Sequence, residues 1–229
     1  MTTQYTAIGR FEQRKDLYGR RYPVIINNKQ EHLVDIHEMI IWTCLNWRIL
    51  EPAQIESMHA FKSRDITEPM AISHAAYIRR LLQRGLIVSG TGSNGSEALF
   101  DLFSNLYIVP LTSSMFVRLV TFVKRTLIDG MPFHVSKAVL KRENYVGCER
   151  QIIDLVSQAQ LSTAELVKCI EYKANDLSND KKVLDILYHD DVTTCDNIGS
   201  YVKTSHEFSS VLVAVANLYL RRQILFERI

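Results

Sequence analysis

The stretch at residues 69–97 constrains the fold most, because its pattern changes from helical to extended at a single glycine. In its first half apolar residues recur every three to four positions, which predicts an amphipathic helix. Gly85 can adopt the left-handed conformation that ends a helix, and the apolar residues 86–89 then predict a strand. A polar turn is predicted at residues 90–95. The order is therefore helix, glycine stop, strand and glycine-rich turn.

Further elements are predicted on both sides of this stretch. One helix is predicted from Ile36 and another from Pro52, since proline fits the first turn of a helix. The inward faces of these two helices are predicted to consist of Ile36, Ile40, Cys44, Trp47, Ile55, Met58 and Phe61. Thr67 is predicted to cap the third helix. A strand is predicted at residues 22–26, a short helix at 98–103 and a strand at 106–110.

The segment LLQRGLIVSG at residues 81–90, together with this order of elements, resembles a winged helix-turn-helix domain of the bacterial or phage transcription-regulator type. The resemblance covers roughly residues 33–110. It implies a mainly α fold with small β wings, in the α+β class. The expected parts are a basic arm and strand (1–32), a winged-helix domain (33–111), a connecting helix and basic linker (112–148), and a helical or second winged-helix-like domain (149–229).

The resemblance also implies a surface for double-stranded DNA. In this family the third helix enters the major groove, while later basic residues and the wing hold phosphates. Carried onto this chain, the implied contacts are Ser73 and Ala76 near bases, Arg79, Arg80, Gln83 and Arg84 near the backbone, and Ser93 and Asn94 at the wing tip. Ala75 and Ala76 depart from the serine and arginine often found there, and His74 replaces a usual aliphatic residue. Base reading is therefore expected to be weaker or to use other residues.

Charge is unevenly distributed, although the formal net charge is only +2. Residues 1–50 carry a net charge of +2 and residues 111–150 carry +4, whereas residues 51–110 carry −1 and residues 151–229 carry −3. The first 21 residues include Arg10, Arg14, Lys15, Arg20 and Arg21. This segment predicts a mobile arm along DNA phosphates, an added strand, or a solvated tail.

The carboxyl half is predicted to be helical. A long helix is predicted at residues 112–130, and Ser162 with Glu165 has the spacing of a capping box. Residues 183–198 match residues 40–55 at an offset of 143, and residues 220–226 match residues 82–88 at an offset of 138. The similarity predicts either a second unit of the same kind or an unrelated pair of amphipathic helices.

No motif predicts catalysis or a bound group. Residues 90–95 spell G-x-G-x-x-G, but a long helix precedes the strand and no acidic residue ends the next strand, so a wing or turn is the stronger interpretation. The seven histidines show no ligand spacing with one another or with the cysteines. The sequence has no long apolar run, and Cys44, Cys148, Cys169 and Cys195 are widely spaced. We therefore expect a cytoplasmic protein without cofactor, metal, membrane partner or enzymatic activity.

The sequence predicts a sequence-specific DNA-binding transcriptional regulator. The alternative is a tandem winged-helix adaptor for protein-protein assembly on DNA or in chromosome maintenance. A homodimer through the carboxyl half is expected, because residues 211–220 are apolar almost all round. That half also offers a surface for another protein partner. A positive strip around Arg79 and Arg80 would favour DNA, and an acidic or apolar surface would favour the adaptor.

Overall fold

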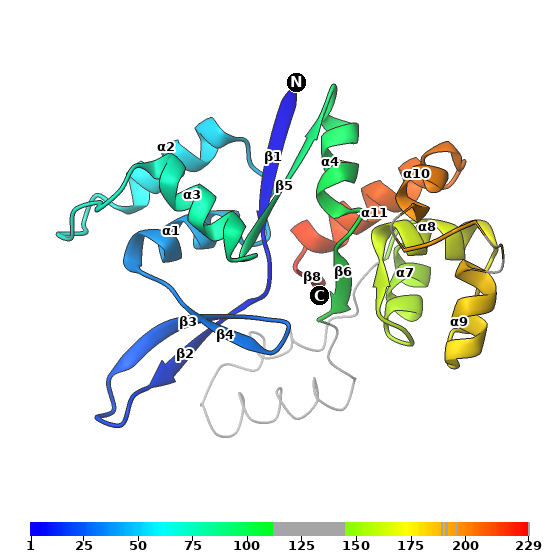
Figure 1. The fold of residues 1–229 in the computed structure, drawn as a ribbon, viewed down its shortest axis with the longest axis horizontal. Coiled ribbons are helices and arrows are strands. Elements are labelled where there is room, and N and C mark those ends of the chain that lie inside the picture. Colours follow the sequence, from blue (N-terminus) through cyan, green and yellow to red (C-terminus); the bar gives the residue numbers. More distant parts are fainter. Residues whose placement is uncertain (112–144, 189, 191, 196, 229) are drawn as a thin grey trace, which may run out of the picture.

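The computed structural model describes residues 1–111, 145–188, 190, 192–195 and 197–228. These residues form a mixed α+β fold in which helices accompany small antiparallel sheets (Figure 1). The α+β class expected from the sequence is therefore correct. The helix predicted at residues 112–130 and most of the basic linker predicted at residues 112–148 lie outside the described residues.

Strand β1 (Thr2–Ala7) lies at the centre of the strand pairing in the first half of the chain. It pairs antiparallel with β5 (Ile87–Gly92), and on its other side Tyr5 forms a bridge to Leu50. The beginning of the predicted basic arm is thus a strand that enters the core. A solvated tail is the wrong interpretation of these residues.

Three helices pack beside this pairing: α1 (Ile36–Leu45), α2 (Pro52–Lys62) and α3 (His74–Gln83). The third helix begins later than predicted, since Ser73 rather than Thr67 accepts the capping hydrogen bond, from the backbone N–H of Ala76. The inward face of α2 also differs. Ile55 and His59 are buried, whereas Phe61 is 67% exposed.

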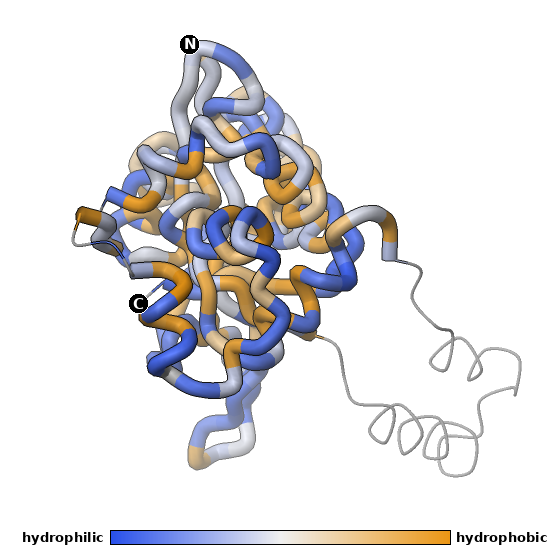
Figure 2. Tube along the Cα trace, turned by 90° about the vertical axis from the view of Figure 1, so that its right-hand side faces the viewer, coloured by the Kyte–Doolittle hydropathy of each residue, from blue (hydrophilic) through white to orange (hydrophobic). Residues whose placement is uncertain are grey.

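A three-stranded antiparallel sheet is inserted between β1 and α1. Its strands are β2 (Arg10–Lys15), β3 (Arg21–Asn27) and β4 (Gln30–Leu33), in the order β2-β3-β4. Asn28 and Lys29 make the turn between β3 and β4 with positive φ angles. The strand predicted at residues 22–26 is confirmed. The hairpin of β2 and β3 extends away from the body of the molecule and is mostly hydrophilic (Figure 2).

Helix α4 (Gly95–Phe103) follows β5 directly, and the predicted glycine-rich wing is wrong. The strand continues through Gly92 instead of ending at residue 89. A Cβ atom at Gly90 would lie 2.3 Å from the carbonyl oxygen of Ala98, and one at Gly92 would lie 2.4 Å from the amide nitrogen of Ala98. These glycines therefore allow α4 to pack closely on β5, which a pattern read only for turns does not reveal.

The second half of the chain repeats the arrangement of the first. Strand β6 (Tyr107–Pro110) lies between β7 (Leu161–Ser162) and β8 (Ile224–Glu227). The helices that correspond to α1, α2 and α3 are α7 (Glu149–Val156), α8 (Thr163–Glu171) and α11 (Phe208–Leu220). Between α8 and α11 this half also contains α9 (Asp180–Leu187), α10 (Ile198–Tyr201) and the 3-10 helix η3 (Val202–Thr204).

Strand register identifies the corresponding residues. The central residue and its two partners are Tyr5, Leu50 and Ser89 in the first half, and Ile108, Leu161 and Phe226 in the second. The offset is 111 from Leu50 to Leu161 and 137 from Ser89 to Phe226. Residues 2–92 are termed the first unit below, and the described residues between 107 and 227 are termed the second unit.

An ion pair between a buried glutamate and a partly exposed arginine recurs at the same two offsets. Glu38 at the start of α1 accepts hydrogen bonds from Arg84, and Glu149 at the start of α7 accepts one from Arg221. Both glutamates are 1% exposed. The capping box of α2 also recurs 111 residues later in α8, where Ser162 is the N-cap as predicted.

The equivalences predicted at offsets of 143 and 138 are wrong. Val183 and Leu187 belong to α9, which has no counterpart in the first unit, and the counterpart of α1 is α7. After the third helix, the left-handed Gly85 corresponds to the left-handed Arg222, with φ angles of 65° and 60°. That correspondence has an offset of 137. All amphipathic helices share one period, so helical pattern alone does not give a unique match.

Tyr219 of α11 joins the two units. Its hydroxyl accepts hydrogen bonds from Oγ1 of Thr6 at 2.7 Å and from the backbone N–H of Trp47 at 3.0 Å. The centre of its ring lies 4.8 Å from that of Phe226 and 6.2 Å from that of Phe103. One hydroxyl therefore links β1, the segment after α1, and α11.

Helix α11 buries most of its apolar surface within the chain. Its inward residues pack against α7, α8 and α4 side chains, while Val213 and Leu220 remain exposed. The expected homodimer rested on two apolar faces that needed a partner. Since the chain itself covers most of that surface, the homodimer stays a prediction without its original support.

Candidate functional site

The residues predicted to contact DNA do not form one surface. Ser73, Arg79 and Gln83 are exposed on or beside α3, and Ala76 is half-buried next to them. The Oγ of Ser73 is the cap of the helix. Among the described residues, Arg79 is therefore the one cation of the predicted set that is exposed to solvent and forms no ion pair with a carboxylate.

Arg80 and Arg84 are held by carboxylates at the start of α1. Nε of Arg80 donates to Glu38 at 2.6 Å, and a terminal nitrogen of Arg80 donates to Asp35. Nη1 of Arg84 donates to both oxygens of Glu38, at 2.9 and 3.0 Å. Burial alone would raise the pKa of Glu38, but hydrogen bonds from Arg80, the Asp35 backbone and Arg84 lower it overall. The charge of both arginines is thus compensated within the chain.

Ser93 and Asn94 form the cap of α4 and not a wing tip. The N–H and hydroxyl of Ser93 donate to the carboxylate of Glu97 at 2.9 and 2.6 Å. Oδ1 of Asn94 accepts from the backbone N–H of Glu97 at 2.9 Å. Both residues lie at the end of β5 near the N-terminus, away from α3 (Figure 1). The structure does not bring them together with Arg79.

An open groove lies along the side of α3 that carries Arg79. Its volume is about 770 Å³. The lining residues come from β1, α2 and α3: Tyr5, Pro52, Ala53, Glu56, Ser73, His74, Ala75, Ile78, Arg79 and Leu82. More of the lining is apolar than polar, and Glu56 and Arg79 add one charge of each sign. The groove can therefore accept an apolar segment with polar groups at its edge.

The corresponding place in the second unit is filled by the chain itself. Apart from Tyr5 and Ser73, the groove residues correspond at offsets of 111 and 137 to Thr163, Ala164, Val167, Val211, Leu212, Val215, Ala216 and Tyr219. All of these are at most 8% exposed. Phe103 of α4 packs against Tyr219, and α10 and η3 lie against α8. The first unit has no such cover among the described residues.

The two grooves differ in charge as well as in cover. Glu56 corresponds to Val167, and Arg79 corresponds to Ala216. Burying an unpaired charge costs several kcal/mol, so a permanently covered groove requires apolar residues at these positions. The charged residues in the first unit are consistent with a surface that is exposed for at least part of the time.

Three histidines from three helices meet beside the groove. His37 of α1 is 4% exposed and His59 of α2 is 3% exposed, with Nδ1 of His37 lying 3.3 Å from Nε2 of His59. The rings of His59 and His74 are 5.3 Å apart, and Nε2 of His37 lies 3.1 Å from the carbonyl oxygen of Glu68. Burial lowers the pKa of His59, and the other two histidines lower it further; burial also lowers the pKa of His74. No local spacing in the sequence marks this cluster.

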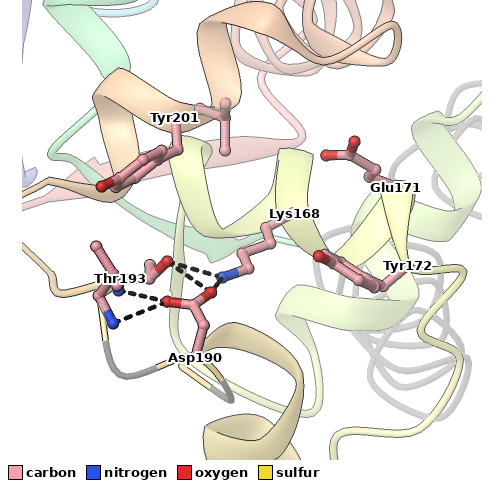
Figure 3. A pocket seen from close by; sticks show the side chains of 8 residues that line it. Lys168, Glu171, Tyr172, Asp190, Thr193 and Tyr201 are labelled. Atoms are coloured by element: carbon pink, nitrogen blue, oxygen red, sulfur yellow. Dashed lines mark hydrogen bonds and ion pairs between the residues drawn. The ribbon is translucent and has the colours of Figure 1, made fainter.

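A second hollow, of about 390 Å³, lies between α8 and the segment before α10 (Figure 3). The ammonium of Lys168 donates to the carbonyl of Leu187 at 2.6 Å and to Asp190 and Thr193 at 3.2 Å each. These three bonds use all of its N–H donors. Hydrogen bonds from Thr193, and then from Lys168, hold the pKa of Asp190 well below its usual range. Because Lys168 is committed to holding this segment, the hollow is a weaker candidate than the groove.

The described part of the chain contains no group of three or more histidine, cysteine, aspartate or glutamate side chains arranged to hold a metal ion. Among the described helices, none is both long enough and apolar enough to cross a membrane. Comparisons with protein-family models, with curated proteins and with solved structures found no match.

Proposed function

We propose that the protein is a tandem winged-helix adaptor that binds a segment of a partner protein in the groove of its first unit. The contrast between the units carries this proposal: the groove is open in the first unit, and its counterpart is filled in the second. In each unit the third helix leads through a left-handed residue into a strand. That order supports describing both units as winged-helix-like, with a strand from before the first helix completing the sheet.

The second unit suggests the chemistry of the bound segment. Its covering helix α4 carries Phe100 and Phe103, which lie on one helix face. Phe103 packs on Tyr219, the counterpart of the groove residue Leu82. We therefore expect the partner to present an amphipathic helix with an aromatic side chain over Ile78 and Leu82 and polar groups near Glu56 and Arg79. Binding of a helix in an apolar groove is a recurrent mode of protein recognition.

The charges on α3 favour a protein partner over DNA at this surface. DNA binding by the third helix needs several cations that can replace phosphate counterions. Arg80 and Arg84 already compensate Glu38 and Asp35. Glu56 adds a negative charge beside Arg79. The surface is thus mixed and largely apolar, which is the condition that favours the adaptor.

Duplex DNA binding remains the second candidate, with a different set of contacts. Lys15 and Arg21 are both exposed and stand directly opposite each other in the β2-β3 pair. Like charges at directly opposed positions destabilise a strand pair, and a phosphate between them would relieve the repulsion. A DNA-binding regulator would then use this hairpin, together with Arg79 and Gln83.

Selection from a library of displayed helical peptides, followed by affinity measurement, tests the adaptor function. The blocking variant is Ala75→Arg in the groove, and its matched control is Ala60→Arg, an exposed position of α2 outside the groove. The wild-type protein and the control should select the same aromatic-bearing helices. The blocking variant should lose affinity by tenfold or more, or about 1.4 kcal/mol. Selection of no helix, or equal affinity for the blocking variant, would contradict the proposal.

A further inference from the structure

We propose that His37, His59 and His74 form a proton-sensitive clasp. In the neutral state the clasp holds residues 63–73 and the start of α3 against α1 and α2, and protonation opens it. The three side chains come from the three helices of the first unit. The segment between α2 and α3 is attached to the clasp because His37 faces the carbonyl oxygen of Glu68.

The contacts of His37 determine where its proton lies. A carbonyl oxygen only accepts, so Nε2 of His37 must carry the hydrogen that points to Glu68. Its Nδ1 is then an acceptor, and the hydrogen between His37 and His59 lies on Nε2 of His59. A second proton on Nδ1 of His37 would place two N–H groups head to head at 3.3 Å in a buried site. This contact therefore requires that Nδ1 of His37 carries no hydrogen.

His74 adds a second group whose charge is unfavourable. It is the first residue of α3, where the positive end of the helix dipole opposes a cation. Its Nε2 is buried and has no hydrogen-bond partner among the described residues. On α2, Glu56 raises the pKa of His74, but burial has the larger and opposite effect. The neutral form is therefore favoured while the clasp is closed.

The groups around the cluster do not supply a negative charge to the buried pair of His37 and His59. On α3, the ring of Tyr77 lies 5.7 Å from that of His37, and the guanidinium of Arg80 lies 5.4 Å from the ring of Tyr77. On α1, the carboxylates of Asp35 and Glu38 are bound by Arg80, and Glu38 also by Arg84. Glu68 contributes its backbone carbonyl. A proton added to the pair would therefore stay uncompensated by these groups.

The pH dependence follows from the direction of these shifts. In an opened or unfolded chain a histidine titrates near pH 6.5. The closed form holds the pKa of His59 and His74 below that value, so the opened form binds more protons as the pH falls. Above about pH 6.5 the equilibrium between the closed and opened forms does not depend on these histidines. Below that pH the equilibrium constant for opening rises by about tenfold per pH unit for each extra proton that the opened form binds. Since His74 also lines the groove, opening would alter one end of the binding site.

Hydrogen exchange of the full chain tests the clasp directly. After correction for intrinsic rates, the hydrogen-bonded amides within residues 63–78 should exchange faster below about pH 6.5, by about tenfold per pH unit if one of His59 and His74 takes up a proton on opening and by up to about a hundredfold if both do. In His59→Gln, which cannot titrate, this slope should be flatter. The control His206→Gln alters an exposed histidine and should keep the wild-type slope. An unchanged slope in His59→Gln, or no slope in the wild type, would overturn the proposal.

Two further measurements use the wild-type protein, so their results do not depend on whether the His59→Gln variant folds. NMR titration of the wild-type protein should give His59 and His74 midpoints below pH 6.5, and ordinary midpoints would overturn the clasp. Added zinc should not change exchange at pH 7.5, and strong protection by zinc would identify a metal site instead. The effect on partner binding rests on the proposed function. Peptides that fail to bind at any pH would contradict the adaptor while leaving a pH-dependent exchange slope to support the clasp.

Discussion

Arg221, the residue after α11, donates a hydrogen bond to the buried carboxylate of Glu149 at the start of α7. Arg84 and Glu38 have the same relationship in the first unit. In each case the ion pair joins the third helix of a unit to its first helix. Buried carboxylates need such partners, because an unpaired charge in the interior is costly. The recurrence at two fixed offsets is the strongest sign that both units have one architecture.

The two ion pairs should differ in their sensitivity to mutation. Glu38 retains Arg80 when Arg84 is lost, whereas Arg221 is the cation bound to Glu149 among the described residues. Arg84→Ala should therefore lower the free energy of unfolding by about 1 kcal/mol and Arg221→Ala by about 3 kcal/mol. Urea unfolding of both variants checks the order. A larger loss for Arg84→Ala would contradict this explanation of the pairs.

Substitution of Gly90 should be costly because of its backbone neighbours. A Cβ atom there would lie 2.3 Å from both the carbonyl oxygen of Ala98 and the amide nitrogen of Leu102. Gly90→Ala should therefore destabilise the protein by about 3 kcal/mol, at the upper end of overpacking effects. Gly95→Ala meets no atom within 4 Å and serves as the control. Thermal unfolding distinguishes them, and a neutral Gly90→Ala would mean that α4 does not pack on β5 as described.

Helices and strands were predicted from the sequence better than the segments against which they pack or pair. Gly85 ends α3 and Ser162 caps α8 because both effects are local and depend on residues close in sequence. The place of β1 beside β5 depends on pairing between residues 80 to 90 positions apart, for which the sequence carries no local signal. The glycines of β5 suggested a turn because glycine is common in turns. Glycine also occurs where a helix packs closely on a strand, as α4 does on β5, so the residue type alone does not distinguish the two cases.

The candidate site was predicted only in part, for a similar reason. Exposure of Arg79 and Gln83 follows from helical period, and the structure agrees. Period also put Arg80 and Arg84 outside the apolar stripe, but it could not reveal that the carboxylate of Glu38 lies opposite them. His37 and His59 are 22 residues apart and meet only after α1 and α2 have packed.

The four cysteines should react with thiol reagents at different rates. Cys195 is exposed, whereas Cys44 and Cys169 are buried. Burial, and then the charge of Glu165, raises the pKa of Cys169 to about 12, so little reactive thiolate forms at pH 8. Cys195 should be modified first, and Cys44 and Cys169 only with unfolding. Mass spectrometry of timed samples checks this, and Cys195→Ser should remove the fast phase. Early modification of Cys169 would contradict its burial.

Duplex binding, the second candidate function, should depend on the hairpin. If Lys15 and Arg21 each contact a phosphate, replacing both with alanine lowers the salt slope of binding by about 2. Lys181→Ala, an exposed change on α9, should leave the slope unchanged. Arg80→Ala should reduce stability and not the slope, because Arg80 pairs with Glu38 and Asp35. A reduced slope in a stable Arg80→Ala protein would return α3 to the DNA interface.

Site-specific photo-crosslinking in cells that express the protein from its native gene tests the groove most directly. A photoreactive amino acid replaces Ala75 inside the groove or Ala60 outside it. Position 75 should crosslink to one protein, through a helical segment that carries an aromatic residue, and position 60 should not. Equal adducts at both positions, or adducts from position 75 to DNA alone, would contradict the groove as a protein-binding site.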